Sequence, residues 1–105
     1  MEITYILVTT TVAKEQQAAE LAHSIMGAEL AACVAMQAIR SVYRWKGEVC
    51  DEPEWRLTIK TTEQKYPDLE QHIKGHHAYE MPEIVKLQIS GGSREYLAWI
   101  GQSVE

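Results

Sequence analysis

An α+β fold is what the sequence predicts, and three observations predict it. Strand-like and helix-like patterns follow one another in the order strand, helix, strand, strand, helix, strand, which is the split βαβ arrangement. A two-residue turn signal, Lys46-Gly47, joins two unusually long strand patterns. The length of 105 residues with 46% hydrophobic content suits one domain with a modest core. We therefore expect a ferredoxin-like domain over residues 1–105, with a long protruding hairpin and a short C-terminal helix.

The first two elements are predicted by their hydrophobic periodicity. Residues 3–11 are β-branched or apolar nearly throughout, which is typical of a central strand that is buried on both faces. Residues 14–26 instead carry apolar side chains at spacings of three and four, which predicts a helix that packs on the sheet. We expect Gly27 to cap this helix. The apolar stripe consists of Ala18, Leu21, Ala22, Ile25 and Met26.

The hairpin arms, residues 31–45 and 48–62, are far longer than the usual strand of about five or six residues. A two-residue turn at Lys46-Gly47 places Cys50 opposite Tyr43 and Cys33 opposite Lys60. The two sulfurs then lie roughly 30 Å apart, at about 3.3 Å per residue, which is beyond the reach of a disulfide. We expect two free thiols, and reduced thiols suit a cytoplasmic protein.

A second helix is predicted after the hairpin. Pro67 is typical of a first helical turn, and Leu69 and Ile73 form the inner face. Gly75 is predicted to end this helix. Met81-Pro82 then predicts a loop.

The C-terminal part is predicted to contain a strand and a short helix. Residues 84–90 resemble a strand, and Gly91-Gly92 predicts a turn. Ser93 is a suitable N-cap for the final helix, and Trp99 is expected to cover the end of the sheet. The inward side chains of this helix are predicted to be Tyr96, Leu97 and Ile100.

The long hairpin predicts self-association. Two helices of about 12 residues, roughly 18 Å each, cannot cover arms of about 15 residues, roughly 50 Å. The excess carries Val42, Tyr43, Trp45 and Trp55. An isolated two-stranded ribbon is marginal in water, and its free edges invite pairing. We therefore expect the hairpin to dock on other copies of the chain.

Composition and motifs disfavour several classes of function. The net charge is −5, with 10 Lys and Arg against 15 Asp and Glu, which argues against nucleic acid as a partner. No run of about 18 apolar residues predicts a membrane span, and the start shows no basic and apolar leader, so we expect a cytoplasmic protein without membrane contact. We expect that the protein is not an enzyme, because the sequence has neither a nucleophile motif with a matching base nor a glycine-rich loop that could bind phosphate.

Six short stretches occur in an order that is similar to a known family. They are Ala31-Ala32-Cys33-Val34, residues 41–47 (SVYRWKG), Glu54, residues 59–61 (IKT), residues 77–84 (HAYEMPEI) and residues 96–99 (YLAW). Together they resemble the CutA family, the divalent-cation-tolerance proteins, from residue 6 to residue 100. The resemblance implies a ferredoxin-like subunit in a compact homotrimer. It also implies a role in the response to metal ions, with copper or other divalent cations as ligands.

Cys33 and His77 are the candidate metal ligands, since thiolate and imidazole suit copper and zinc. A tight site normally needs three or four ligands, so we expect others from a second subunit. The alternative for Cys33 is a small buried side chain on a strand. His72 and His76 have the i, i+4 spacing of helical metal pairs, but a helix that ends at Gly75 would leave them as ordinary exposed histidines.

A second candidate site is polar and aromatic. Its residues are expected to line a ligand cleft between subunits near the hairpin, and they are Tyr43, Trp45, Glu54, Lys60, Tyr79, Glu80 and Glu83. The alternative is that the aromatic side chains are interface anchors, which such contacts favour. Lys60 could likewise form a structural ion pair with Glu54 or Glu83.

Two functional hypotheses follow from these sites, and a third remains open. The first is a trimeric protein that binds copper or another divalent metal ion. The second is a trimeric signalling scaffold similar to the PII proteins, which would hold a small effector between subunits or contact an unknown protein. In the third, the trimer serves mainly assembly and stability, and metal tolerance is indirect.

Overall fold

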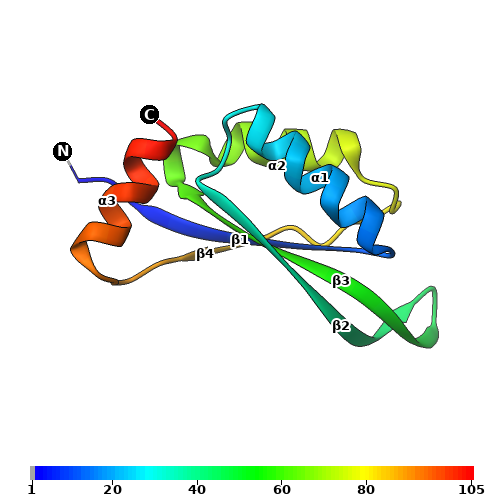
Figure 1. Cartoon of the computed structure of the whole chain (residues 1–105). Helices are drawn as coiled ribbons and strands as arrows, with labels where there is room; N and C mark the ends of the chain where they lie inside the picture. The colour runs from blue at the N-terminus through cyan, green and yellow to red at the C-terminus, as the bar shows by residue number, and fades with distance from the viewer. Residues whose placement is uncertain (1) are drawn as a thin grey trace.

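The computed structural model describes residues 2–105, which form a four-stranded sheet with two long helices on one face and a third at one end (Figure 1). The predicted order of elements is confirmed. The elements are β1 (Tyr5–Val12), α1 (Glu15–Gly27), β2 (Cys33–Trp45), β3 (Glu48–Thr62), the 3-10 turn η1 (Glu63–Lys65), α2 (Tyr66–His76), β4 (Val85–Gln88) and α3 (Arg94–Ser103).

The strands lie in the order β2-β3-β1-β4, and each neighbouring pair is antiparallel. Strands β1 and β2 are therefore parallel, with β3 inserted between them and α1 connecting them, which is a split βαβ unit. The edge strand β4 has four residues, fewer than the seven predicted over 84–90. No helix among residues 2–105 combines the length and the apolar character that a membrane crossing requires.

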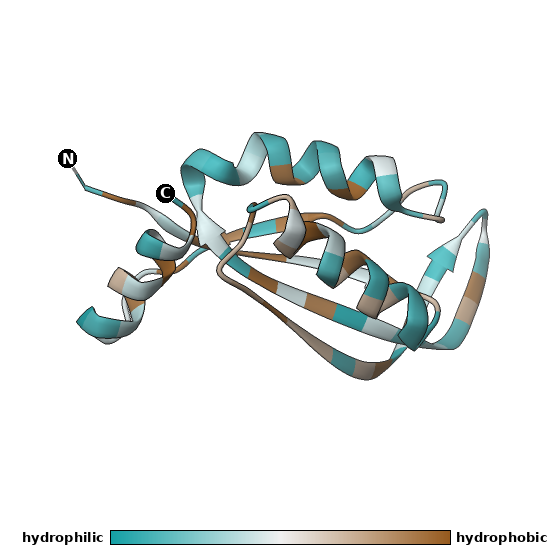
Figure 2. Cartoon of the chain, turned by 45° about the horizontal axis from the view of Figure 1, so that its top comes forward, coloured by the Kyte–Doolittle hydropathy of each residue, from teal (hydrophilic) through white to brown (hydrophobic). Residues whose placement is uncertain are grey.

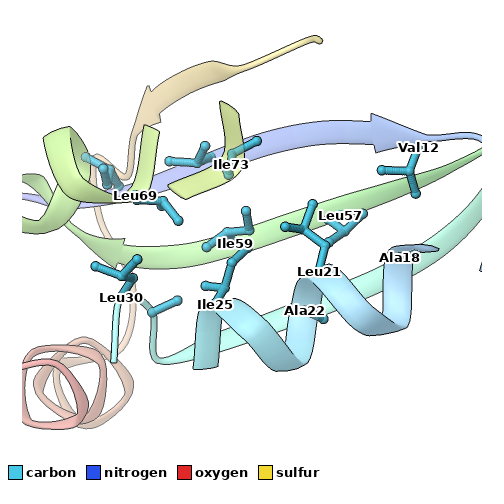
Figure 3. Close-up of a cluster of buried hydrophobic side chains, with 13 residues drawn as sticks. Val12, Ala18, Leu21, Ala22, Ile25, Leu30, Leu57, Ile59, Leu69 and Ile73 are labelled. Atoms are coloured by element: carbon cyan, nitrogen blue, oxygen red, sulfur yellow. The ribbon is translucent and has the colours of Figure 1, made fainter. Parts of the chain in front are cut away.

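The core lies between the sheet and helices α1 and α2, where aliphatic side chains from both layers interdigitate (Figure 3). Leu57 and Ile59 of β3 are fully buried against Ile25 of α1 and Ile73 of α2. The predicted inner faces of the two helices are confirmed, except that Met26 is 42% exposed. Along the strands, hydrophobic and hydrophilic residues alternate in bands (Figure 2), because successive side chains point to opposite faces.

Helix α1 does not end with Gly27 as its cap, contrary to the prediction. Ala28 is the C-cap, and Glu29 takes the left-handed conformation at φ 60°. The amide of Glu29 donates to the Met26 carbonyl (3.0 Å), and the amide of Leu30 donates to the Ile25 carbonyl (3.2 Å). These bonds form a Schellman motif, and Leu30 and Ile25 share the core, so burial stabilises the turn without glycine.

Helix α2 also continues beyond its predicted end at Gly75. His76 is its last residue, and its ring Nδ1 lies 2.8 Å from the carbonyl oxygen of His72. The ring thus contacts the last turn of its own helix. Gly75 remains inside the helix, so it marks no boundary.

The hairpin has the predicted register along its whole length. Lys46 and Gly47 both have positive φ, 52° and 83°, as a type I′ turn requires. Cys33 faces Lys60 and Cys50 faces Tyr43, and both cysteines are free. Beyond the end of β1 the hairpin continues as a two-stranded ribbon that curls away from the sheet (Figure 1).

The ribbon exposes most of its predicted apolar excess, but not all of it. Val42 is 66% exposed and Trp45 is 38% exposed, as expected for side chains that one chain cannot cover. Trp55 instead packs against the core beside Val12, its partner on β1. It therefore contributes to the fold of the single chain and is not part of the excess.

Helix α3 begins at the predicted cap, since the Ser93 hydroxyl accepts a hydrogen bond from the Tyr96 amide (3.2 Å). Ile100 is buried and Leu97 packs beside it, in agreement with the prediction. Tyr96 and Trp99 are 41% and 43% exposed, so neither is a core residue of the single chain. Tyr96 points toward the sheet face that α1 and α2 leave uncovered, where it contacts Cys33 and Lys60.

Candidate functional site

Apart from Tyr43 and Trp45 on the ribbon, the predicted site residues lie in two separate places. The first, which we call the loop cluster, consists of His77, Tyr79, Glu80 and Glu83 in the loop after α2, together with Glu54 on β3. The second, the α3 cluster, consists of Cys33, Lys60 and Tyr96. The two clusters are separated along β3. Lys60 of β3 is the partner of Cys33, and Arg56, four positions earlier, is the partner of Thr11, whose carbonyl oxygen His77 contacts. Four positions correspond to about 13 Å.

His77 is held by both of its ring nitrogens. Nε2 lies 2.8 Å from the Thr11 carbonyl oxygen, which can only accept, so Nε2 carries the proton. Nδ1 accepts a hydrogen bond from the Tyr79 amide at 3.1 Å. Burial lowers the pKa of His77, and the Thr11 carbonyl and Glu54 offset this only in part. In this neutral tautomer the one ring lone pair available for a metal ion, on Nδ1, already accepts the hydrogen bond from the Tyr79 amide.

Tyr79 connects the loop to the base of the hairpin. Its hydroxyl donates to Glu54 Oε2 at 2.6 Å, and the Glu54 side chain is only 7% exposed. Burial, followed by this hydrogen bond, raises the pKa of Tyr79. The phenol therefore stays protonated and acts as the donor to a buried carboxylate.

Two further carboxylates extend these contacts. Glu80 lies 3.6 Å from Lys46 Nζ in the hairpin turn, and Glu83 accepts a hydrogen bond from the Thr9 hydroxyl (2.9 Å) on the central strand. The loop thus touches the hairpin turn, the hairpin base and β1. Among residues 2–105, Lys60 forms no ion pair with Glu54 or Glu83, contrary to the alternative expected from sequence.

The α3 cluster joins a thiol, an ammonium group and a phenol. Lys60 Nζ donates to the Tyr96 hydroxyl at 3.2 Å, and Cys33 Sγ lies 3.8 Å from the same oxygen. The hydrogen bond to Tyr96 raises the pKa of Lys60, and nearby Cys33 acts in the same direction. The hairpin register predicts the Cys33 and Lys60 pair, but no sequence signal places Tyr96 there, because docking of α3 decides it.

Within one chain, the predicted metal ligands do not converge. Cys33 belongs to the α3 cluster and His77 to the loop cluster. In the part of the chain that the structure describes, no group of three or more His, Cys, Asp or Glu side chains is arranged to hold a metal ion. A tight site therefore needs ligands from outside the single chain.

Two cavities border the loop cluster, and Tyr79 lines both. One, of about 280 Å³, lies between α1 and the end of α2, where His76 and His77 form part of its wall. The other, of about 560 Å³, lies between α2 and the loop and is lined by Lys74 and Glu80 among others. Tyr43 and Trp45 line neither of these two cavities.

The chain is similar to proteins whose names concern tolerance of divalent cations. Residues 6–103 match the family model of the CutA1 divalent ion tolerance protein. The chain is 41% identical over 98 residues to the divalent-cation tolerance protein CutA of Thermus thermophilus, which covers 92% of this chain and 95% of that protein. It is 40% identical over 99 residues to the chloroplastic protein CutA of Arabidopsis thaliana, which covers 93% of this chain but 54% of the plant protein.

Solved structures agree with the sequence comparisons. The divalent cation tolerance protein CutA1 from Thermus thermophilus superposes with a TM-score of 0.91 at 39% identity, covering 96% of this chain and 99% of that one. CutA1 from Oryza sativa gives a TM-score of 0.93 at 39% identity, covering 98% and 95%. The fold described above is thus shared over nearly the full length of both proteins.

Proposed function

Since this chain belongs to the CutA1 family of divalent ion tolerance proteins, we propose that it acts in tolerance of divalent cations as a homotrimer that binds copper or another divalent ion. The observation that carries this proposal is the family match over residues 6–103, together with near-complete coverage of the Thermus thermophilus relative. The names of the matching family and of the Thermus thermophilus relative denote tolerance of divalent cations and no enzymatic reaction. We propose a cytoplasmic location on the basis of the two free thiols.

The exposed apolar surface supports self-association. On the sheet face without helices, Val85 and Leu87 are 46% and 56% exposed, and on the ribbon Val42 and Val49 are 66% and 64% exposed. Exposed apolar groups on a ribbon and an edge strand are typical of surfaces that another chain covers. We propose that ferredoxin-like subunits join through these surfaces into a trimer.

Light scattering after size exclusion tests the assembly. We expect the mass of three chains, independent of protein concentration, and a smaller species for Val42→Glu. Met81→Glu is the matched control, because Met81 is also highly exposed (73%) but lies in the loop. A wild-type protein that remains a monomer at all concentrations would refute the trimer.

Cys33 is the proposed principal metal ligand. Its thiol is half-buried on the face where subunits would meet, and thiolate is a preferred ligand for copper(I). One thiolate from each chain becomes sufficient when neighbouring subunits supply the remaining ligands. For His77 to take part, Nδ1 would have to exchange the Tyr79 amide for the ion.

Competition against a copper(I) chelator tests the ligands. We expect Cys33→Ser to weaken copper binding at least tenfold, which corresponds to about 1.4 kcal/mol. Cys50→Ser is the control, because Cys50 is also half-buried and free but lies opposite Tyr43 on the ribbon. His77→Gln in the same assay shows whether His77 contributes. Equal affinity of wild type and Cys33→Ser would exclude Cys33 as a ligand.

A further inference from the structure

The smaller of the two cavities lies on the helix side of the sheet, opposite the face that carries the α3 cluster. Helix α1 begins and helix α2 ends at the same end of the molecule, and both border this cavity (Figure 1). Its volume of about 280 Å³ is close to the lower limit of about 300 Å³ for ligand pockets, so it suits a small molecule. Its apolar wall includes Val12 of β1 and Leu21 of α1, which are 5% and 4% exposed.

The polar part of the wall consists mainly of hydrogen-bond acceptors. Glu20 contributes a carboxylate, which forms no ion pair among residues 2–105. The Ser24 hydroxyl oxygen lies 2.7 Å from Nε2 of His72, and it keeps a free lone pair whichever of the two atoms donates. Nδ1 of His76 donates to the His72 carbonyl oxygen at 2.8 Å, so Nε2 of the neutral His76 ring is an acceptor.

The charges around the cavity favour a cation. Helix α2 ends at His76, and the end of a helix carries partial negative charge on its free carbonyl groups. The opposite charge at the start of α1 is offset by Glu15 in its first turn. In the part of the chain that the structure describes, no lysine or arginine lines this cavity. The oxygen of Gln17, which also belongs to the wall, accepts a hydrogen bond from the Lys14 amide (3.2 Å), so this side chain is held at the start of α1.

We propose that this cavity binds a small aliphatic primary amine in its ammonium form, with the charged group at Glu20 and the carbon chain against Val12 and Leu21. An ammonium group has three donors and no acceptor, which matches a wall of acceptors. A metal ion matches less well, because no group of three His, Cys, Asp or Glu side chains among residues 2–105 is arranged to hold one. The site lies within one chain, so it requires neither the trimer nor Cys33.

NMR titration of the full-length chain with butylammonium chloride tests the site. We expect saturable shifts of the backbone amide signals of Ser24 and Ala78, which line the cavity. Glu20→Gln keeps the shape of the side chain but removes its charge, and it should raise the Kd about three- to fivefold, the range of a partly exposed ion pair. Glu20 is exposed, so this change is expected to leave the fold intact. Glu95→Gln is the control, because it removes the same charge from α3 at the other end of the molecule (Figure 1), and it should leave the Kd unchanged.

A second titration, with 1-butanol, separates recognition of the ammonium group from filling of an apolar space. We expect no saturable shifts with this uncharged analogue at the same concentrations. The proposal would be overturned by an equal Kd for wild type and Glu20→Gln, or by equal binding of 1-butanol. Shifts spread over the surface would also overturn it, because they would show general attraction to a chain with a net charge of −5. The copper assay with Cys33→Ser tests the proposed function separately, since that residue lies on the other side of the sheet.

Discussion

Deletion of one hydroxyl group tests how the loop cluster stabilises the hairpin. Tyr79→Phe removes the hydrogen bond to Glu54, which is 2.6 Å long and ends on a carboxylate that is 7% exposed. Hydrogen bonds to charged groups contribute about 1.5–3 kcal/mol to stability. A buried acceptor that is left without its donor also costs the full free energy of removing it from water. We expect the free energy of unfolding to fall by about 2 kcal/mol.

Urea denaturation at a fixed protein concentration measures this loss, because the stability of the proposed trimer would depend on concentration. The matched control is Tyr66→Phe, which removes a similar hydrogen bond of 2.7 Å to Glu70. The Glu70 side chain is 34% exposed, far more than Glu54. The hydrogen bond to Glu70, followed by burial, raises the pKa of Tyr66 to about 12. Water can replace the donor there, so we expect a much smaller loss. Equal losses in the two variants would refute the role of burial.

A double-mutant cycle separates the pair from other effects of the substitution. Glu54→Gln alone, Tyr79→Phe alone and both together are compared in the same assay. If the hydrogen bond is the cause, the two changes are not additive, with a coupling energy of about 1–2 kcal/mol. Additive losses would show that Tyr79 stabilises the loop in some other way.

Three further predictions follow from the structure. Gly47→Ala should destabilise the protein by about 1 kcal/mol because the φ of Gly47 is +83°. Gly75→Ala should instead stabilise it by about 0.5–1 kcal/mol, since Gly75 is helical with open space around it. Thermal unfolding measures both changes, and shifts of the same sign would contradict these backbone conformations. Leu69→Ala should cost about 2–5 kcal/mol in chemical denaturation, because Leu69 is fully buried, and a loss below about 1 kcal/mol would argue against this core. The pKa of His77 is lowered in the folded chain, so the unfolded chain binds more protons below about pH 6.5. The free energy of unfolding should therefore fall as the pH drops through that value, and His77→Gln should make this dependence on pH less steep. An unchanged dependence on pH would exclude His77 as its source.

Much of the fold could be predicted from local patterns. The apolar stripe of α1, the alternation along the strands and the Lys46-Gly47 turn each satisfy a rule that depends on near neighbours in sequence. The turn fixes which residues face each other along both arms, so the separation of Cys33 from Cys50 follows from the sequence. The errors occur at the ends of elements, where Glu29 and His76 satisfy backbone groups through contacts that no glycine rule describes.

The candidate sites were predicted less completely. The sequence singled out Cys33 and His77 by their chemistry, but their positions depend on how the loop after α2 and helix α3 dock on the sheet. The i, i+4 spacing of His72 and His76 is also visible in the sequence, but the prediction that α2 ends at Gly75 placed His76 outside the helix. Ser24, which orients His72, lies 48 positions away in sequence and could not be associated with it.

By itself the sequence determined the element order, the hairpin register, the two free thiols and the resemblance that the family match confirms. Only the tertiary structure decided which ring nitrogens are occupied, that Tyr79 reaches Glu54, and that Tyr96 joins Cys33 and Lys60. The reason is physical. Periodicity and turn chemistry are properties of neighbouring residues, whereas a site depends on the docking of segments that are distant in sequence, and this docking is set by the packing of the whole core.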